Sequence, residues 1–332
     1  MALAVRSGHH AMSGVEFPVP NMFAPVSTPA LMIRTLSWLV LAVCAVIFVV
    51  VSYLLIHALV RYRTRAGEDA HEPPQVYGST SIEVAWIVLP LLIVVVLFMA
   101  TARTIFGIER AAAPAGALQV TVVGHQWWWE FRYPDLGIVT ANELHIPISE
   151  SGERRPTYLR LESVDVIHSF WIPQLNGKTD VIPNQPNVMW VEPVQAGAYY
   201  GQCAEYCGTQ HANMQIRVFA HAKGAFDQWV ATQQARAVEA PQVAVGRAVF
   251  MATACVNCHA VRGTGAAGTF GPDLTHLMSR TTIGAGAARN TRDDLLKWIK
   301  DPAHIKPGVL MPAMNLTDGQ TQAVVTYLLT LK

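Results

Sequence analysis

The sequence predicts a membrane-anchored, multidomain chain: two transmembrane helices, then a β-sandwich, then a small helical domain. Three observations lead to this prediction. Two long apolar runs lie in the first third of the chain, short stretches of period two fill the middle, and amphipathic helical patterns occupy the end. With 332 residues, the chain is long enough for all of these parts. The net charge of +1 gives no reason to expect nucleic-acid binding.

The two apolar runs cover residues 35–60 and 83–102. Each is long enough to cross a hydrocarbon core of about 30 Å. The first run begins too late and extends too far for a signal peptide. Arg61, Arg63 and Arg65 follow it, and clustered arginines predict a cytoplasmic loop. We therefore expect a two-pass membrane protein with both termini and the soluble domains on the outer side.

After the apolar runs, the periodicity of the apolar residues changes twice. From Leu118 apolar residues alternate with polar ones between turn residues, at the spacing of a sandwich. From Val243 the pattern is helical, and Thr317 opens the last helix. The expected segments are an outer-face N-terminal segment 1–34, a hairpin 35–106, a β-sandwich 117–222, a short helix and linker 223–242, and a helical domain 243–332.

The stretch "GQCAEYCGTQHANM" collects two thiols, an imidazole and a thioether in Cys203, Cys207, His211 and Met214. Zinc rarely binds a thioether, whereas soft sulfur ligands together with imidazole are typical of copper. A disulfide between the two cysteines is the alternative, and it would leave His211 and Met214 without a role.

A blue-copper site uses two histidines, one cysteine and a weak axial methionine, so this stretch has one histidine too few and one cysteine too many. The missing histidine must come from His125, His145 or His168. We favour His168, because "DVIHSFWIP" places it between a strand and a loop. Two thiolates would let two coppers share bridging sulfurs, with Met214 and the backbone carbonyl of Glu205 at the weak positions.

The motif "CVNCH" predicts covalent attachment of haem c through Cys255 and Cys258, with His259 as an axial iron ligand. A thioredoxin-like redox pair would need a βαβ context, and the surroundings here are helical. Met311, in "KPGVLMPAM", is the expected sixth ligand, and Met314 is the alternative. Ligation by His and Met raises the potential of the iron and suits electron transfer.

Taken together, these segments resemble subunit II of haem–copper cytochrome c oxidases, in the caa form that carries a fused C-terminal cytochrome c. The resemblance implies a two-helix transmembrane hairpin, a cupredoxin-like β-sandwich and an all-α class I cytochrome c domain. The matching stretches are the hairpin, "GHQWWWEF", "DVIHSFWIP", "GKTDVIPN", "GQCAEYCGTQHANM" and "CVNCH". The sequence departs from the usual pattern in its "WWW" run and in "NQPN".

The resemblance also implies roles for particular residues. The dinuclear copper centre, CuA, would be ligated by His168, Cys203, Glu205 through its carbonyl, Cys207, His211 and Met214. The Glu205 side chain resembles a ligand to a magnesium ion shared with subunit I. Trp127 resembles the ring through which electrons enter, although it could be a core aromatic, as expected for Trp128 or Trp129. Glu83 resembles an acid near a proton-channel entrance, with an interfacial carboxylate as the alternative.

The implied function is that of the electron-entry subunit of a respiratory terminal oxidase. Electrons would pass from an external donor, such as cytochrome c or another redox protein, through haem c and CuA to subunit I, which reduces oxygen to water. Expected partners are subunit I, other oxidase subunits and the lipid bilayer. The implied location is the bacterial plasma membrane, with both termini and the soluble domains on the periplasmic side. The alternative is the matching subunit of a copper-containing nitric oxide reductase. A copper-delivery protein would lack "CVNCH", and a quinol oxidase subunit would lack the copper ligands.

The two soluble domains carry opposite charge, with acids in excess over residues 117–222 and bases in excess over residues 243–332. Opposite fields favour docking, and a short linker near 235–242 keeps the domains close. We expect the helical domain to dock on the acidic face around Trp127, with its haem edge near Arg262 and Lys306.

Overall fold

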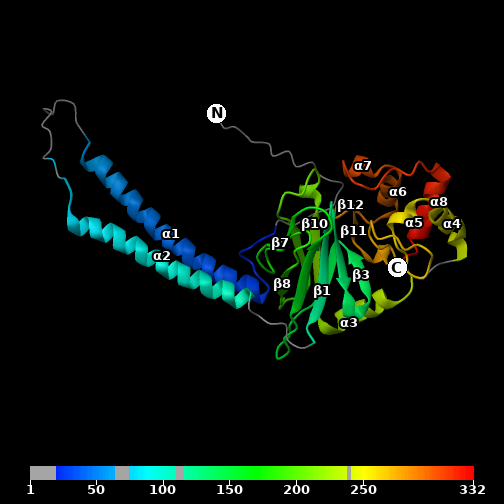
Figure 1. The fold of residues 1–332 in the computed structure, drawn as a ribbon, viewed down its shortest axis with the longest axis horizontal. Helices are drawn as coiled ribbons and strands as arrows, with labels where there is room; N and C mark the ends of the chain where they lie inside the picture. The colour runs from blue at the N-terminus through cyan, green and yellow to red at the C-terminus, as the bar shows by residue number, and fades with distance from the viewer. Residues whose placement is uncertain (1–19, 64–74, 76, 110–115, 238–240) are drawn as a thin grey trace. The chain divides into compact units, whose positions relative to one another are not determined.

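The computed structural model describes residues 20–63, 75, 77–109, 116–237 and 241–332. They fall into two units: Leu31–Ala112 holds the apolar helices, and Met1–Ala30 with Ala113–Lys332 forms the other unit (Figure 1). Arg65, the first nineteen residues, the connector 110–115 and linker positions 238–240 lie outside the described residues.

The membrane unit consists of two long helices, α1 (Thr28–Arg61) and α2 (Thr80–Glu109), which run antiparallel in Figure 1. Each contains an 18-residue stretch apolar enough to cross a membrane, and their lengths of 34 and 30 residues exceed what a membrane core of about 30 Å requires. A Cβ added at Gly107 would lie 2.4 Å from Met32 Cε, so this glycine allows the helices to approach closely. The helices continue beyond the apolar runs 35–60 and 83–102 at each end.

The sandwich has two five-stranded sheets, with strand orders β3-β2-β1-β5-β8 and β4-β10-β9-β6-β7. Most neighbouring strands are antiparallel, but β1 pairs with β5, and β10 with β4, in parallel. The strands are β1 (Leu118–His125), β2 (Trp128–Tyr133), β3 (Ile138–Ala141), β4 (Glu143–Pro147), β5 (Thr157–Ser163), β6 (His168–Trp171), β7 (Thr179–Val181), β8 (Asn187–Val191), β9 (Gly197–Cys203) and β10 (Gln215–His221). Residues 116–221 are called the β lobe below.

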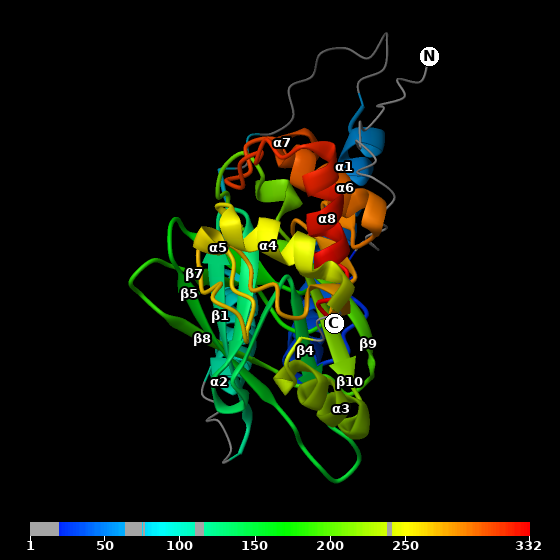
Figure 2. The same cartoon turned by 90° about the vertical axis from the view of Figure 1, so that its right-hand side faces the viewer.

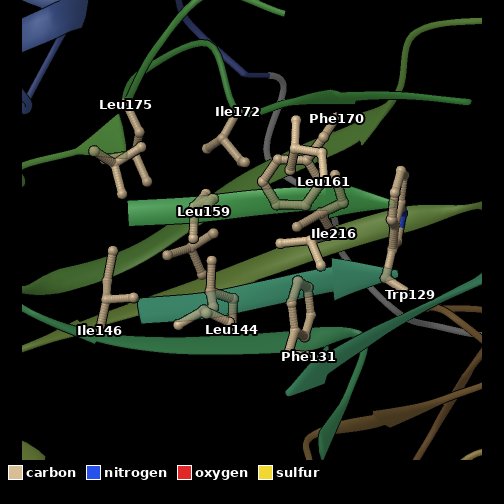
Figure 3. Packing of buried hydrophobic residues seen from close by; sticks show 14 of the residues in the cluster. Trp129, Phe131, Leu144, Ile146, Leu159, Leu161, Phe170, Ile172, Leu175 and Ile216 are labelled. Atoms are coloured by element: carbon tan, nitrogen blue, oxygen red, sulfur yellow. The ribbon is translucent and has the colours of Figure 1, made fainter. Parts of the chain in front are cut away.

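Apolar side chains from both sheets meet in the middle of the β lobe (Figure 3). Successive side chains of a strand point to opposite faces of the sheet, so every second one points into the core. The side chains of β10 are accordingly half-buried and buried in turn. The aromatic rings of Trp129 and Phe170 meet edge to face, with centroids 5.2 Å apart. This core fixes the strand ends at which the candidate ligands lie.

The N-terminal residues before α1 contact the β lobe. The Val26 amide donates to Gln174 O at 3.0 Å, and the Glu192 amide donates to Ser27 Oγ at 2.9 Å. Helix α3 (Lys223–Gln234) follows the last strand, close to the expected 224–235, and Trp229 on it stacks on His145 at 4.5 Å.

The C-terminal part, residues 241–332, is called the helical lobe below. Its elements are η3 (Pro241–Val243), α4 (Ala244–Ala252), α5 (Cys255–Cys258), η4 (Leu277–Ser279), β11 (Thr282–Ile283), β12 (Ala288–Arg289), α6 (Arg292–Lys300), α7 (Pro302–Ile305) and α8 (Asp318–Leu328). Figure 2 shows α8 beside α4 and α6. Gly246 permits the α4–α8 contact, since an added Cβ would lie 1.9 Å from Ala323 O.

As predicted, Thr317 caps α8, and Gln320 completes a capping box with it. The predicted fold class is confirmed in each of its three parts. The helical lobe departs from all-α in the short β11–β12 ladder and in the isolated bridge between Ala260 and Ala267.

Candidate metal centre

Two free thiols form the middle of the site. Cys203 ends β9 and Cys207 lies in the loop after it, and both side chains are buried. Their Sγ atoms are 3.8 Å apart, well beyond the disulfide bond length of about 2.05 Å. The pair is therefore arranged as two neighbouring sulfur ligands and is not cross-linked.

Each sulfur has an imidazole beside it. His168 Nδ1 lies 3.9 Å from Cys203 Sγ, and His211 Nδ1 lies 3.6 Å from Cys207 Sγ. His168 is distant in sequence, but β6 pairs with β9 so that Phe170 lies opposite Cys203. The sheet register brings this histidine to the thiols.

Each sulfur also has a weak donor nearby. The carbonyl of Glu205 lies 3.1 Å from Cys203 Sγ, and Met214 Sδ lies 3.9 Å from Cys207 Sγ. Met214 is fully buried. All six donors expected from the sequence thus lie together, as two matching sets of thiol, imidazole and weak donor. Soft sulfur and imidazole in this number fit a pair of copper ions sharing the two sulfurs.

The other two candidate histidines lie elsewhere. His125 Nε2 is 3.2 Å from Glu130 Oε2. His145 Nδ1 is 2.9 Å from His221 Nε2, in a stacked pair remote from the thiols. Of the three alternatives, the geometry brings only His168 to the sulfurs.

Asp165 is a residue of the site that the sequence reading missed. Its Oδ1 lies 2.9 Å from His168 Nε2, and its Oδ2 accepts the Gln126 amide at 2.6 Å. A carboxylate on the outer nitrogen orients a ligating imidazole and leaves the inner nitrogen, here Nδ1, for the metal. The signal available in the sequence was an acid three residues before the histidine.

Hydrogen bonding within the site perturbs its titration. The contact with Cys207 lowers the pKa of the Cys203 thiol, and the same contact raises the pKa of Cys207. Burial alone would lower the pKa of His168, but its bonds to Asp165 and Cys203 raise it overall. Without a cation the sulfurs and imidazole share protons, so metal binding must release them.

Trp127 lies directly against the metal-ligand loop. Its Nε1 donates to Cys207 O at 2.9 Å, and Gln126 Nε2 donates to the same carbonyl at 2.7 Å. Gly208 has φ +115°, and a Cβ there would lie 3.0 Å from the indole. Of its two neighbours, Trp129 is the core aromatic and Trp128 stacks on His125 at 4.0 Å.

The cysteines of "CVNCH" lie in the short helix α5, half-buried, with His259 directly after it. His259 Nδ1 donates to Pro272 O at 2.7 Å, which leaves Nε2 as the free ligand nitrogen. Burial lowers the pKa of His259 and so favours the neutral form that binds iron. Gly271 lies against the ring, since an added Cβ would be 2.6 Å from His259 Cε1. These features fit a proximal haem ligand.

The remaining predicted residues are less constrained by their surroundings. Met311 and Met314 are both half-buried. The Glu205 side chain is exposed although its carbonyl faces Cys203. Glu83 lies exposed in the first turn of α2.

Three family models match the chain. "Cytochrome C oxidase subunit II, transmembrane domain" matches residues 19–102, "Cytochrome C oxidase subunit II, periplasmic domain" matches 151–221, and "Cytochrome c" matches 243–332. A solved structure, the periplasmic domain of subunit II of the Bradyrhizobium japonicum cytochrome oxidase, is 29% identical and covers 37% of this chain and 97% of its own, with a TM-score of 0.34.

Whole-chain relatives agree with these matches. The cytochrome c oxidase subunit 2 of Alkalihalophilus pseudofirmus is 35% identical over 304 residues, covering 90% of this chain and 85% of the relative. That of Bacillus sp. strain PS3 is 35% identical over 82% of this chain and 80% of the relative. Quinol oxidase subunit 2 of Bacillus subtilis is 32% identical over 58% of this chain and 59% of the relative. With this coverage and identity, the chain belongs to the cytochrome c oxidase subunit 2 family.

Proposed function

We propose that this chain is the electron-entry subunit of a respiratory cytochrome c oxidase. It would accept electrons from an external donor on a covalent haem c, pass them to CuA, and deliver them to subunit I, where oxygen becomes water. The observation that carries this proposal is the convergence of six donors around the Cys203–Cys207 pair, together with the neutral, oriented His259 behind a haem-attachment motif.

In this proposal the copper ligands are His168, Cys203, Glu205 through its carbonyl, Cys207, His211 and Met214. Two coppers bridged by two thiolates would share one electron, so that ligand positions need change little on reduction. The protein's own contribution is to hold the donors fixed. The β6–β9 pairing positions His168, Asp165 orients its ring, and the carbonyl of Cys207 is held by two hydrogen bonds.

The haem c would be attached through Cys255 and Cys258 and ligated by His259 and Met311. The bond from His259 to Pro272 O fixes the ring and increases its basicity. Trp127, bonded to the carbonyl of a copper ligand, would form the electron path into CuA.

The same proposal assigns partners and location. α1 and α2 would anchor the chain in the plasma membrane beside subunit I, with the β and helical lobes on the outer side. The exposed Glu205 side chain is available to a magnesium ion at the subunit I interface. Glu83 would lie near a proton entrance of that subunit.

The family includes quinol oxidase subunits, so the relatives alone do not choose the electron donor. The ligand set favours a redox protein over quinol as the electron donor, because a subunit that receives electrons from quinol needs neither a dinuclear copper centre nor an attached haem. The described residues include six candidate donors for the copper centre and the motif for attaching the haem.

Metal and haem analysis of the purified complex tests the proposal. We expect two coppers and one haem per copy of this chain, with the haem retained in acidic acetone because it is covalently attached. Flash reduction of the haem should be followed by first-order reduction of copper. A single copper, an extractable haem, or a haem that never reduces copper in the intact complex would contradict the proposed function.

A further inference from the structure

A lysine of the helical lobe is buried against the β lobe. Lys306 follows α7, and only 1% of its surface is exposed. Its Nζ donates to Trp127 O at 2.7 Å, Asn213 O at 2.9 Å and Gly284 O at 2.8 Å. An ammonium has three N–H donors, so this group is fully used by three backbone carbonyls.

Two of these carbonyls adjoin the candidate copper centre. Trp127 donates its indole N–H to Cys207 O, and Asn213 directly precedes Met214. The third carbonyl, that of Gly284, belongs to the helical lobe itself. One ammonium therefore links the helical lobe to both sides of the metal-ligand loop.

Because Lys306 is buried, its ammonium group is stable only when all three N–H donors are hydrogen-bonded. A charge removed from water is costly unless every donor is paired, and burial lowers the pKa of Lys306 to about 7. Below about pH 7 the amine is charged, and hydrogen bonds from a charged donor are short, as the three distances of 2.7 to 2.9 Å are. A lobe displaced by a few ångströms would lose several of them at once, so intermediate docking positions are disfavoured.

Adjacent contacts hold the same loop. Gln210 Nε2 donates to Pro307 O at 2.6 Å. Gly308 has φ +85°, and a Cβ there would lie 3.8 Å from Thr209. The loop carrying Lys306 is thus held against the residues just before His211, a candidate copper ligand.

A second group of hydrogen bonds lies on β4. Glu143 Oε1 accepts the Thr281 amide at 2.7 Å, the Thr282 amide at 3.2 Å and the Thr281 hydroxyl. The Gln215 amide, on β10, donates to Ala285 O at 3.4 Å. These amides are shielded by acceptors or donors of the opposite lobe, so their exchange with solvent reports on docking.

We propose that Lys306 is a positioning residue for electron transfer, which locks the helical lobe in one orientation on the Trp127 side of the copper centre. This inference rests on the proposed function. It differs from docking by surface charge, because the contact is a desolvated hydrogen-bond cluster. Docking should therefore be nearly independent of salt, whereas attraction between exposed charged patches weakens as salt is added.

The arrangement also assigns where an external donor must bind. Trp127 is 8% exposed, and its carbonyl is taken by Lys306 of the same chain. A separate donor protein therefore finds little of this residue to contact. Its electrons should enter through the helical lobe.

Hydrogen exchange of the intact, metal-loaded complex tests the lock. In Lys306→Met, the Thr281 and Thr282 amides should exchange about thirtyfold faster, the effect of losing a buried charged hydrogen-bond donor. Lys297→Met is the matched control, because it removes the same charge from a side chain that is 70% exposed. The control should leave these amides unchanged, and the α8 amides should stay protected in both variants.

Two further measurements keep the outcome decisive. Lys306→Gln retains an N–H₂ group and should give a smaller increase in exchange of the Thr281 and Thr282 amides. If Lys306→Met loses α8 protection because the helical lobe unfolds, the Gln variant becomes the test of the lock. The haem-to-copper rate after flash reduction should fall in Lys306→Met by at least about tenfold and should be independent of salt in the unmodified chain.

Equal exchange of Thr281 and Thr282 in the Lys306 variants and in Lys297→Met would overturn the lock. A haem-to-copper rate that falls steeply with salt would also overturn it, in favour of steering by surface charge. Failure of the unmodified complex to pass electrons from haem to copper would instead contradict the proposed function, so the two failures are distinguishable.

Discussion

The two candidate redox sites are built in different ways. In the β lobe, six donors from β6, β9 and the following loop already lie against one another, supported by a core of two packed sheets. In the helical lobe, His259 is fixed by Pro272 O, while Cys255, Cys258 and Met311 are only half-buried. The difference teaches that a sheet register can bring together donors that are distant in sequence, whereas a short helical motif keeps its cysteines and histidine adjacent along the chain.

The largest effect should come from removing a bridging sulfur. Cys207→Ser should abolish the dinuclear centre and its mixed-valence spectrum, because a hydroxyl is a poor bridge between coppers. The exchange protection of strands far from the thiols, such as β5 and β8, should change little, because the serine replaces a single sulfur atom at one end of the core. Met214→Leu is the matched milder variant, and it should keep copper bound with a shifted potential. A mixed-valence spectrum that survives in Cys207→Ser would show that this thiol does not bridge.

A smaller effect is expected from the residue that orients His168. Asp165→Asn should weaken copper binding by about 10- to 100-fold while leaving the stoichiometry at saturation unchanged. Copper competition with a chelator measures this change. Asp180, an exposed acid opposite Ser169 on the neighbouring strand, provides the control as Asp180→Asn. Equal affinities in the two variants would remove Asp165 from the site.

The smallest effect concerns the pH dependence of docking. Burial raises the pKa of Glu143, although the bonds from Thr281 and the charges of Arg217 and Arg280 act to lower it. Because the pKa of Glu143 is higher when the lobes are docked, Glu143 stabilises docking fully at pH values below its undocked pKa of about 4.5. This contribution is lost as pH rises through its docked pKa.

Opening of the lobes should therefore increase as pH rises above about 4.5. Exchange of the Thr281 and Thr282 amides, corrected for intrinsic rates, measures this opening. Glu143→Gln cannot ionise and should show a flat profile at pH values below about 7, where Lys306 keeps its charge. The same slope in Glu143→Gln would assign the pH dependence to other groups.

Much of the fold could be predicted from the sequence, because local signals were strong. Hydropathy gave the hairpin, period-two alternation gave strands such as β5 and β10, and Thr317 marked the start of α8. Helix ends were less predictable. The polar Thr28 and Pro29 begin α1 well before its apolar run, because proline is compatible with a first helical turn.

The donors to copper could be named because they lie in short, unusual motifs. Asp165 and Lys306 could not, because their roles depend on the sheet register and on contacts between distant segments. Docking near Trp127 through Lys306 agrees with the expected place, but the expected chemistry was different. Lys306 is buried on carbonyls and does not form an exposed basic patch at a haem edge.

Both redox sites lie in one chain, so the transfer between them is first order, and the three-carbonyl contact of Lys306 removes the docking step that a loosely tethered lobe would need. A donor joined and locked to its acceptor has no encounter step, so the transfer from haem to copper carries no concentration term. The dependence of the overall rate on the concentration of a soluble electron donor would then report only the binding of that donor to the helical lobe. Dilution of the complex would slow the first step and leave the second unchanged.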